Sequence, residues 1–152
     1  MNNILILENK DQLINFDLKD TFVISTNINL DSFLIKQNIR FTNIYEMIDK
    51  NYFYNLSNEV EKHISNISSE KKITDNLKLT ETYEVTKNYY LRFYLNKLFL
   101  YIKLSELILE KFNPDNAYVC VNKNIDTTDY DLSFGSIFCE YTKQKKNNVI
   151  VK

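Results

Sequence analysis

The stretch 89–121 constrains the fold more than any other part of this chain, because it joins a long apolar segment, a stop signal and a short run of β-favouring residues. Within 89–112 a set of polar residues recurs at steps of four, seven, three and four, which on a 3.6-residue period forms one polar stripe: Arg92, Asn96, Lys103, Glu106 and Glu110. Asn113 and Pro114 end this helix, since the residue before a proline is pushed out of the α region. The run 117–121 is typical of a strand that is buried on both faces. The stretch therefore predicts one long apolar helix that leads into a central strand.

The rest of the chain alternates between strand and helix patterns. We expect further strands at 3–7, 21–25, 39–44 and 148–151 and further helices at 30–37, 45–69 and 134–146, with Asn29 as the N-cap of the first of these helices. Such alternation predicts an α/β fold, and right-handed crossovers favour the strand order 3-2-1-4-5. We therefore expect a Rossmann-like, mainly parallel five-stranded sheet with helices on both faces, as a single domain over 1–152. An all-helical fold is the main alternative.

Composition and charge exclude several classes of protein. The 19 basic and 20 acidic residues are interspersed, so no basic surface for nucleic acid is expected. Charged residues interrupt every window of 89–112 that is long enough to cross a membrane, and no membrane span is predicted. The N-terminus lacks the pattern of a signal peptide, and Cys120 and Cys139 lack the spacing of a metal or redox site. These features predict a cytoplasmic protein.

Polar residues follow the first and the fourth predicted strand. In open α/β sheets, ligands collect outside the carboxyl ends of the strands, at the point where the strand order reverses. This places Glu8, Asn9 and Lys10 opposite Asn122 and Asn124. We expect these five residues to line a ligand site, with Glu8 as the candidate catalytic base.

A second candidate for ligand binding is the segment that opens the helix predicted at 134–146. Ser133, Gly135 and Ser136 precede or begin this helix, and Gly135 is the single glycine of the chain. The free N–H groups of a helix start can receive a phosphate or a sugar hydroxyl. A helix cap with a small residue for close packing is the competing interpretation.

Other candidate sites carry less weight. The turn after the first strand contains no glycine, so the sequence lacks a dinucleotide-binding fingerprint. Asp126, Asp129 and Asp131 include an Asp-x-Asp pattern, but aspartates ahead of a helix are usually caps and turn formers, and we predict no metal site. His63 has no orienting partner nearby in the sequence and is expected to be structural.

The order of these segments resembles a known family. The runs NILIL, DTFVISTN and IRFTNIYEMI, and a long Tyr- and Leu-rich helix leading into EKFNPDNAYVCV, are similar to the N-terminal Rossmann-like domain of GT-B-type glycosyltransferases, especially bacterial surface-polysaccharide biosynthesis proteins. The resemblance includes Pro114-Asp115 before the fourth strand, but the family's glycine-rich first turn is missing. It implies that the chain is the N-terminal part of a longer protein. In such a protein this domain faces the glycan acceptor, and a second, C-terminal domain holds the nucleotide-sugar donor, so no cofactor is expected in this domain.

The sequence also allows a function without catalysis. Surplus apolar surface on the 89–112 helix would then pack against a partner chain, another domain or a second copy of this chain. The hypotheses that remain are the acceptor-side domain of a GT-B-like glycosyltransferase and a non-catalytic binding or assembly module.

Overall fold

The computed structural model describes residues 3–14, 16–70, 81–119, 132–145 and 149–151, of which 67–70, 81–87 and 149–151 are described by their backbone alone. The described chain divides into two compact units. We call Met1–Ile48 with Tyr101–Lys152 the sheet unit, and Asp49–Leu100 the two-helix unit. The single domain expected over 1–152 stays a prediction. Each unit is described separately below.

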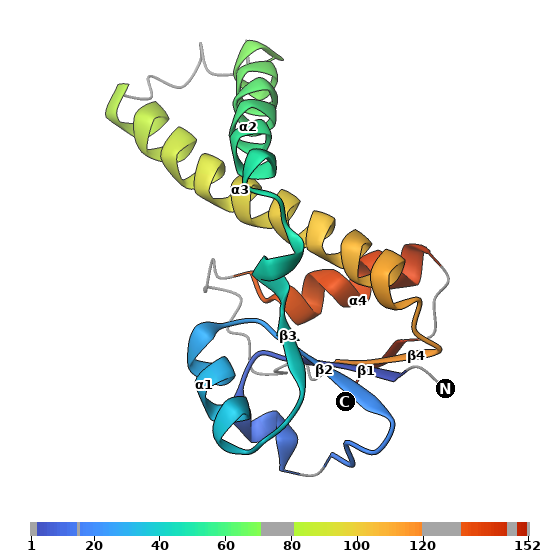
Figure 1. Ribbon diagram of the computed structural model, residues 1–152. Coiled ribbons are helices and arrows are strands. Elements are labelled where there is room, and N and C mark those ends of the chain that lie inside the picture. Colours follow the sequence, from blue (N-terminus) through green and yellow to red (C-terminus); the bar gives the residue numbers. More distant parts are fainter. Residues whose placement is uncertain (1–2, 15, 71–80, 120–131, 146–148, 152) are drawn as a thin grey trace. The chain divides into compact units, whose positions relative to one another are not determined.

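The sheet unit is built on parallel strands (Figure 1). These are β1 (Asn3–Leu7), β2 (Thr21–Ser25), β3 (Phe41–Asn43), β4 (Asn116–Val119) and β5 (Val149–Val151), and their order in the sheet is β3-β2-β1-β4-β5. The α/β class, the parallel sheet and the predicted strand order are thus confirmed. The central strand β1 pairs with both β2 and β4, and four of its five residues are buried.

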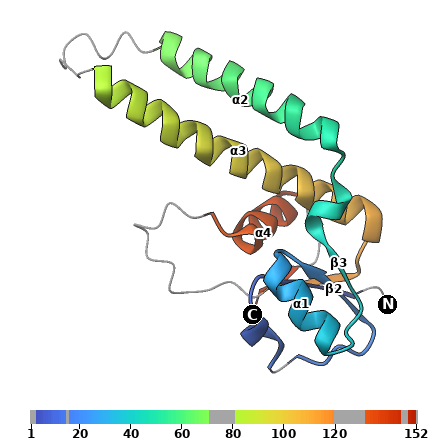
Figure 2. The same cartoon turned by 60° about the vertical axis from the view of Figure 1, so that its left-hand side comes forward.

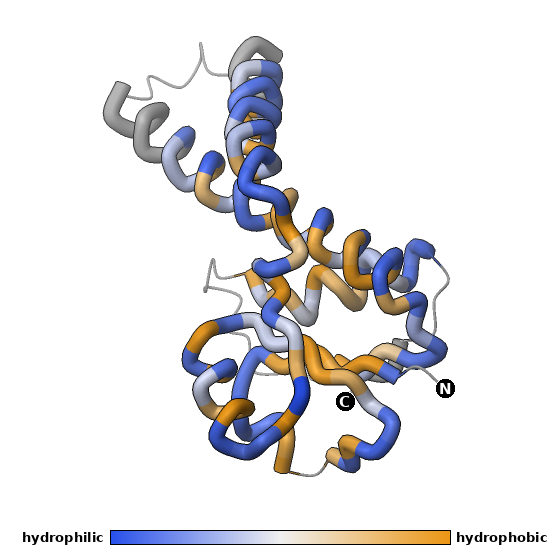
Figure 3. The backbone as a smooth tube through the Cα atoms, in the orientation of Figure 1, coloured by the Kyte–Doolittle hydropathy of each residue, from blue (hydrophilic) through white to orange (hydrophobic). Residues whose placement is uncertain are grey.

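Alternation along the strands sends side chains to two separate faces of the sheet. Leu5 and Leu7 of β1 pack with Leu30 and Leu34 of helix α1 (Ile28–Lys36). Their neighbours Ile4 and Ile6 point to the opposite face, which helix α4 (Phe134–Gln144) covers (Figure 1). Helices therefore cover both faces of the sheet, and Figure 3 shows hydrophobic residues concentrated on its strands.

Several boundaries differ from the predictions, for local reasons. Helix α1 is capped by Asn27 rather than by Asn29, because the Asn27 side chain accepts a hydrogen bond from the Leu30 N–H. Strand β3 covers only part of 39–44, because Asn43 caps the short 3-10 helix η2 (Ile44–Met47) through the Tyr45 N–H. The helix predicted at 45–69 accordingly becomes η2 followed by α2 (Lys50–Glu70).

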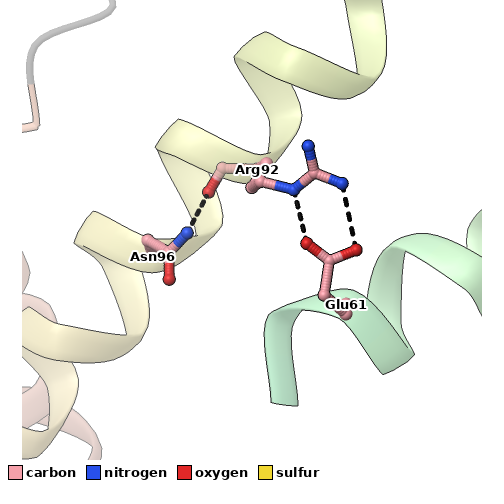
Figure 4. A network of polar contacts seen from close by, with 3 residues as sticks. All are labelled: Glu61, Arg92 and Asn96. Atoms are coloured by element: carbon pink, nitrogen blue, oxygen red, sulfur yellow. Dashed lines mark hydrogen bonds and ion pairs between the residues drawn. The ribbon is translucent and has the colours of Figure 1, made fainter. Parts of the chain in front are cut away.

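The two-helix unit contains α2 and the first part of α3 (Glu81–Phe112), which lie side by side (Figure 2). Its core consists of Leu56, Val60 and Ile64 from α2, packed against apolar side chains that include Leu91, Leu95 and Phe99 from α3. A bidentate ion pair joins the helices, since Arg92 donates to the two carboxylate oxygens of Glu61 at 2.5 Å and 3.0 Å (Figure 4). His63 is exposed and packs edge-on against the Phe99 ring, 5.2 Å between centroids.

The prediction of one long apolar helix was wrong. Helix α3 is long, at 32 residues, and it begins at Glu81 rather than at residue 89, but it is not apolar all round. Tyr89, Tyr90 and Phe93 are more than 60% exposed. The buried residues Leu104 and Ile108 belong to the sheet unit, whereas Leu91 and Leu95 belong to the core of the two-helix unit. The buried apolar residues of α3 do not form one continuous stripe, because its two halves contribute to different cores. Among the described residues, no helix has the length and apolar character needed to cross a membrane.

Candidate functional site

The carboxyl ends of β1 and β2 are joined by polar contacts. The Leu7 carbonyl oxygen accepts hydrogen bonds from the Thr26 N–H at 3.1 Å and from the Thr26 hydroxyl at 3.0 Å. The Asn27 side chain donates to the Glu8 carbonyl oxygen at 3.1 Å while its own oxygen caps α1 at the Leu30 N–H. One asparagine thus fixes the start of α1 and its position relative to the turn after β1.

The turn after β1 is held by its own side chains. Gln12 accepts hydrogen bonds from the N–H groups of Glu8 and Asn9 at 2.8 Å and 3.1 Å, and Asn9 accepts one from the Asp11 N–H at 3.0 Å. These bonds form a capping box around the short 3-10 helix η1 (Lys10–Leu13). Side-chain bonds therefore fix this turn, which contains no glycine, and they hold Glu8, Asn9 and Lys10 at the carboxyl edge of the sheet.

The Glu8 carboxylate lies at the N-terminus of α4. One oxygen accepts the Ser133 hydroxyl at 2.8 Å and the other accepts the Gly135 N–H at 3.0 Å. Ser133 is the N-cap of α4 and also accepts the Ser136 N–H at 3.4 Å. A negative charge at a helix start satisfies free N–H groups and interacts favourably with the helix dipole. The place where the sequence predicted a phosphate or a sugar hydroxyl therefore holds a carboxylate of the chain itself.

Gly135 marks a close approach between α4 and the sheet. A Cβ atom added there would lie 2.8 Å from the Val119 Cγ1 and 3.2 Å from a Glu8 carboxylate oxygen. Val119 is fully buried in β4, so it cannot move aside easily. This geometry supports the interpretation of Gly135 as a small residue for close packing.

A cavity of about 510 Å³ opens beside Glu8 at the same edge of the sheet. It lies between the turn after β1 and the first turns of α1, and its lining combines amides, a hydroxyl, two lysines and one aromatic ring: Glu8, Asn9, Lys10, Asn27, Asn29, Leu30, Ser32, Phe33 and Lys36. A volume of this size suits a small-molecule ligand, for which pockets of roughly 300–1,000 Å³ are usual. The polar lining suits a ligand with several hydrogen-bonding groups.

The predicted site residues fall into two groups. The structure brings Glu8, Ser133, Gly135 and Ser136 together at the start of α4, while Asn9 and Lys10 line the cavity with Glu8. Asn122 and Asn124 lie outside the described residues, as do Asp126, Asp129 and Asp131. Within the described part of the chain, no three His, Cys, Asp or Glu side chains gather as a metal site would require.

Sequence reasoning missed the contribution of α1 to the cavity. Asn29, Ser32 and Lys36 follow one another at i, i+3 and i+7, and this spacing places them on one helix face. This spacing, in a helix that directly follows the second strand, is the signal that could have identified these three residues as part of the cavity lining.

The buried thiol of α4 shows no sign of reactivity. Cys139 is 4% exposed, and burial raises the pKa of its thiol. A raised pKa keeps the thiol protonated and therefore a poor nucleophile. The other cysteine, Cys120, lies outside the described residues.

The fold and the cavity together define the sheet unit as a parallel α/β domain with a polar cavity at the carboxyl edge of its strands. No family model, no curated protein and no solved structure matches the chain.

Proposed function

We propose that the sheet unit binds a hydroxyl-rich ligand, namely a glycan acceptor, in the carboxyl-edge cavity, as the acceptor-side domain of a GT-B-like glycosyltransferase of bacterial surface carbohydrate biosynthesis. The observation that carries this proposal is the cavity lining. Amide groups of Asn9, Asn27 and Asn29 and the Ser32 hydroxyl can each donate and accept hydrogen bonds, which sugar hydroxyls require. The nucleotide-sugar donor would be held by a second domain or a partner chain.

The position of the cavity also supports this proposal. It lies at the carboxyl ends of β1 and β2, the edge where open α/β sheets place their ligands. The Phe33 ring adds an apolar surface of the kind that can face the C–H groups of a sugar. Glu8 contributes to the lining while Ser133 and Gly135 fix its carboxylate. A general-base role for Glu8 stays a prediction.

The binding step is tested by titrating the 152-residue chain with saccharides and monitoring its amide NMR signals. We expect saturable shifts at Asn27, Asn29 and Ser32 with at least one neutral saccharide from a panel of hexoses, N-acetylhexosamines and disaccharides. Asn29→Ala should weaken this binding because it removes an amide from the lining. Asn58→Ala is the matched control, since Asn58 is an exposed asparagine of α2 in the other unit.

Two results would contradict the proposal. The first is that no saccharide shifts the cavity residues, or that Asn29→Ala binds as the wild type does. The second is that a nucleotide sugar shifts the same amides at a lower concentration than any neutral saccharide. That second result would place the donor in this domain and remove the acceptor-side assignment.

A second candidate function is a binding or assembly module without catalysis. It is favoured by six aromatic side chains of the two-helix unit that are 38–75% exposed: Phe53, Tyr54, Tyr89, Tyr90, Phe93 and Tyr94. Aromatic residues are enriched in protein interfaces. In this case the partner to test first is a second copy of the chain.

Sedimentation at several protein concentrations tests this second function. A dimer is expected if these exposed aromatic side chains pair between two copies of the chain, and Tyr90→Ala combined with Phe93→Ala should convert it to a monomer. Tyr45→Ala is the control, because Tyr45 is also exposed, at 42%, but belongs to the sheet unit. A wild-type chain that stays monomeric at every concentration would exclude self-assembly.

A further inference from the structure

A second cavity opens at the opposite edge of the sheet, where the strands begin. It has a volume of about 560 Å³ and is lined by the first residues of β1 and β2, the loop before β2, the residue before β3 and the end of α3: Asn3, Ile4, Leu18, Asp20, Thr21, Phe22, Arg40, Lys111 and Phe112. All of these residues belong to the sheet unit. Neither the sequence patterns nor the proposed acceptor site accounts for a cavity at this edge.

Two aromatic rings form an apolar surface in this cavity. Phe22 of β2 and Phe112 of α3 lie with their ring centroids 5.1 Å apart and their planes 31° from parallel. Both side chains are only half-buried, so part of each ring remains accessible. Leaving two adjacent phenylalanine rings partly in contact with water forgoes a stabilising burial. A planar ligand that covered them would recover this contribution.

Each ring also has a cation over it. The Arg40 guanidinium carbon lies 5.8 Å from the centre of the Phe22 ring, and the Lys111 Nζ lies 5.6 Å from the centre of the Phe112 ring. Both distances fall within the range of a cation–π interaction. Among the described residues, neither cation forms an ion pair, whereas Arg92, Lys103 and Lys143 each do. The positive charge of Arg40 and Lys111 is therefore not neutralised by a direct partner.

Negative charge near the cavity does not cancel these cations. Asp20 lines the cavity but lies beyond ion-pair distance of both cations, and the C-terminus of α3 contributes roughly half a negative charge. The two positive charges of Arg40 and Lys111 therefore exceed the combined negative charge of Asp20 and the helix end by roughly half a unit. The balance favours a ligand with one negative group.

We propose that this amino-edge cavity binds a small planar aromatic anion, a ring that carries a carboxylate or a phosphoryl group. The ring of the ligand packs against the accessible parts of the Phe22 and Phe112 rings, beside the two cations. Its anionic group receives hydrogen bonds from Arg40 and Lys111. An arginine and a lysine suit carboxylate and phosphoryl oxygens alike, so the two kinds of anionic group are distinguished by experiment.

The test uses four probes and amide and aromatic NMR of the full chain. Phenylphosphonate and benzoate each carry a ring and a negative group, inorganic phosphate carries only the charge, and benzyl alcohol carries only the ring. We expect saturable binding of phenylphosphonate or benzoate, with nuclear Overhauser contacts from the ligand ring to the rings of Phe22 and Phe112. Inorganic phosphate and benzyl alcohol should bind at least about fivefold more weakly, because each lacks one of the two contacts.

Charge-removing variants locate the binding. Arg40→Gln and Lys111→Gln should each weaken binding of the aromatic anion by at least about fivefold, as expected for the loss of one charge-assisted contact. Lys145→Gln is a closely matched control, because Lys145 also lies over an aromatic ring, 5.7 Å from the centre of Tyr141, but outside this cavity. Lys36→Gln, in the carboxyl-edge cavity, should likewise leave the affinity unchanged.

Three outcomes would overturn the proposal. One is the absence of saturable binding of both aromatic anions to the wild-type chain, which no folding defect of a variant can explain. Another is equal affinity for inorganic phosphate, which would reduce the site to charge attraction. The third is an equal loss of affinity in Lys145→Gln, which would show that only the overall charge matters. None of these outcomes bears on saccharide binding at the carboxyl edge, so the two proposals fail independently.

Discussion

Glu8 provides the sharpest test of how this fold is held together. Its carboxylate accepts two hydrogen bonds at the start of α4, from the Ser133 hydroxyl and the Gly135 N–H. Replacement by glutamine retains one acceptor oxygen but loses the charge and one of the bonds. A hydrogen bond to a charged group contributes about 1.5–3 kcal/mol and a charge at a helix start about 0.3–1 kcal/mol.

Glu8 is half-buried, so the lower ends of these ranges apply. We expect Glu8→Gln to lower the free energy of unfolding by about 1–2 kcal/mol and Glu8→Ala by about 2–3 kcal/mol, because alanine loses both bonds. Asp11→Asn removes an exposed carboxylate from the same turn and should change the free energy of unfolding by less than about 0.5 kcal/mol.

Urea unfolding followed by far-UV circular dichroism measures these differences, and amide hydrogen exchange in α4 shows whether the loss is local. Exchange in α4 should accelerate in Glu8→Gln more than exchange in α1. If Glu8→Gln is as stable as Asp11→Asn, the carboxylate does not hold α4, and the case for a chemical role of Glu8 becomes stronger.

Three further predictions concern packing, pH and reactivity. Gly135→Ala should destabilise the chain by about 1 kcal/mol, because overpacking costs about 1–3 kcal/mol and the gain in helix preference is under about 1 kcal/mol. A double-mutant cycle measured by urea unfolding should show that Val119→Ala reduces this cost. The hydrogen bond from Arg92 lowers the pKa of Glu61 below its usual 4.5, so this ion pair should stabilise the fold above pH 4.5 and lose its effect as the pH falls through the lowered pKa. Carbon NMR of the Glu61 carboxyl group reads this titration, which Arg92→Gln should move back toward 4.5. Iodoacetamide should alkylate Cys139 far more slowly in the folded chain than in urea, as peptide mass spectrometry can measure, and rapid alkylation of the folded chain would contradict the raised pKa.

Local patterns were sufficient to predict the strands and the class of fold. The runs at 3–7 and 21–25 are β1 and β2 at the predicted positions, because each is a short apolar run bounded by polar turns. The candidate site was predicted in part. Glu8, Asn9 and Lys10 line the carboxyl-edge cavity because parallel strands bring their carboxyl ends to the same edge.

The sequence by itself thus determined which segments become strands and helices, the topology of the sheet and the edge where polar side chains gather. These features depend on periodicity, caps and the handedness of crossovers, which act over short distances or follow general rules. Only the tertiary structure decided that the Glu8 carboxylate lies at the start of α4, where it binds Gly135, a residue 127 positions away in the sequence. It also decided that the two halves of α3 belong to different cores. Only the tertiary structure placed Phe22, Arg40 and Phe112 around one cavity. These contacts join residues far apart in the chain, and no local pattern encodes which distant surface a side chain will meet.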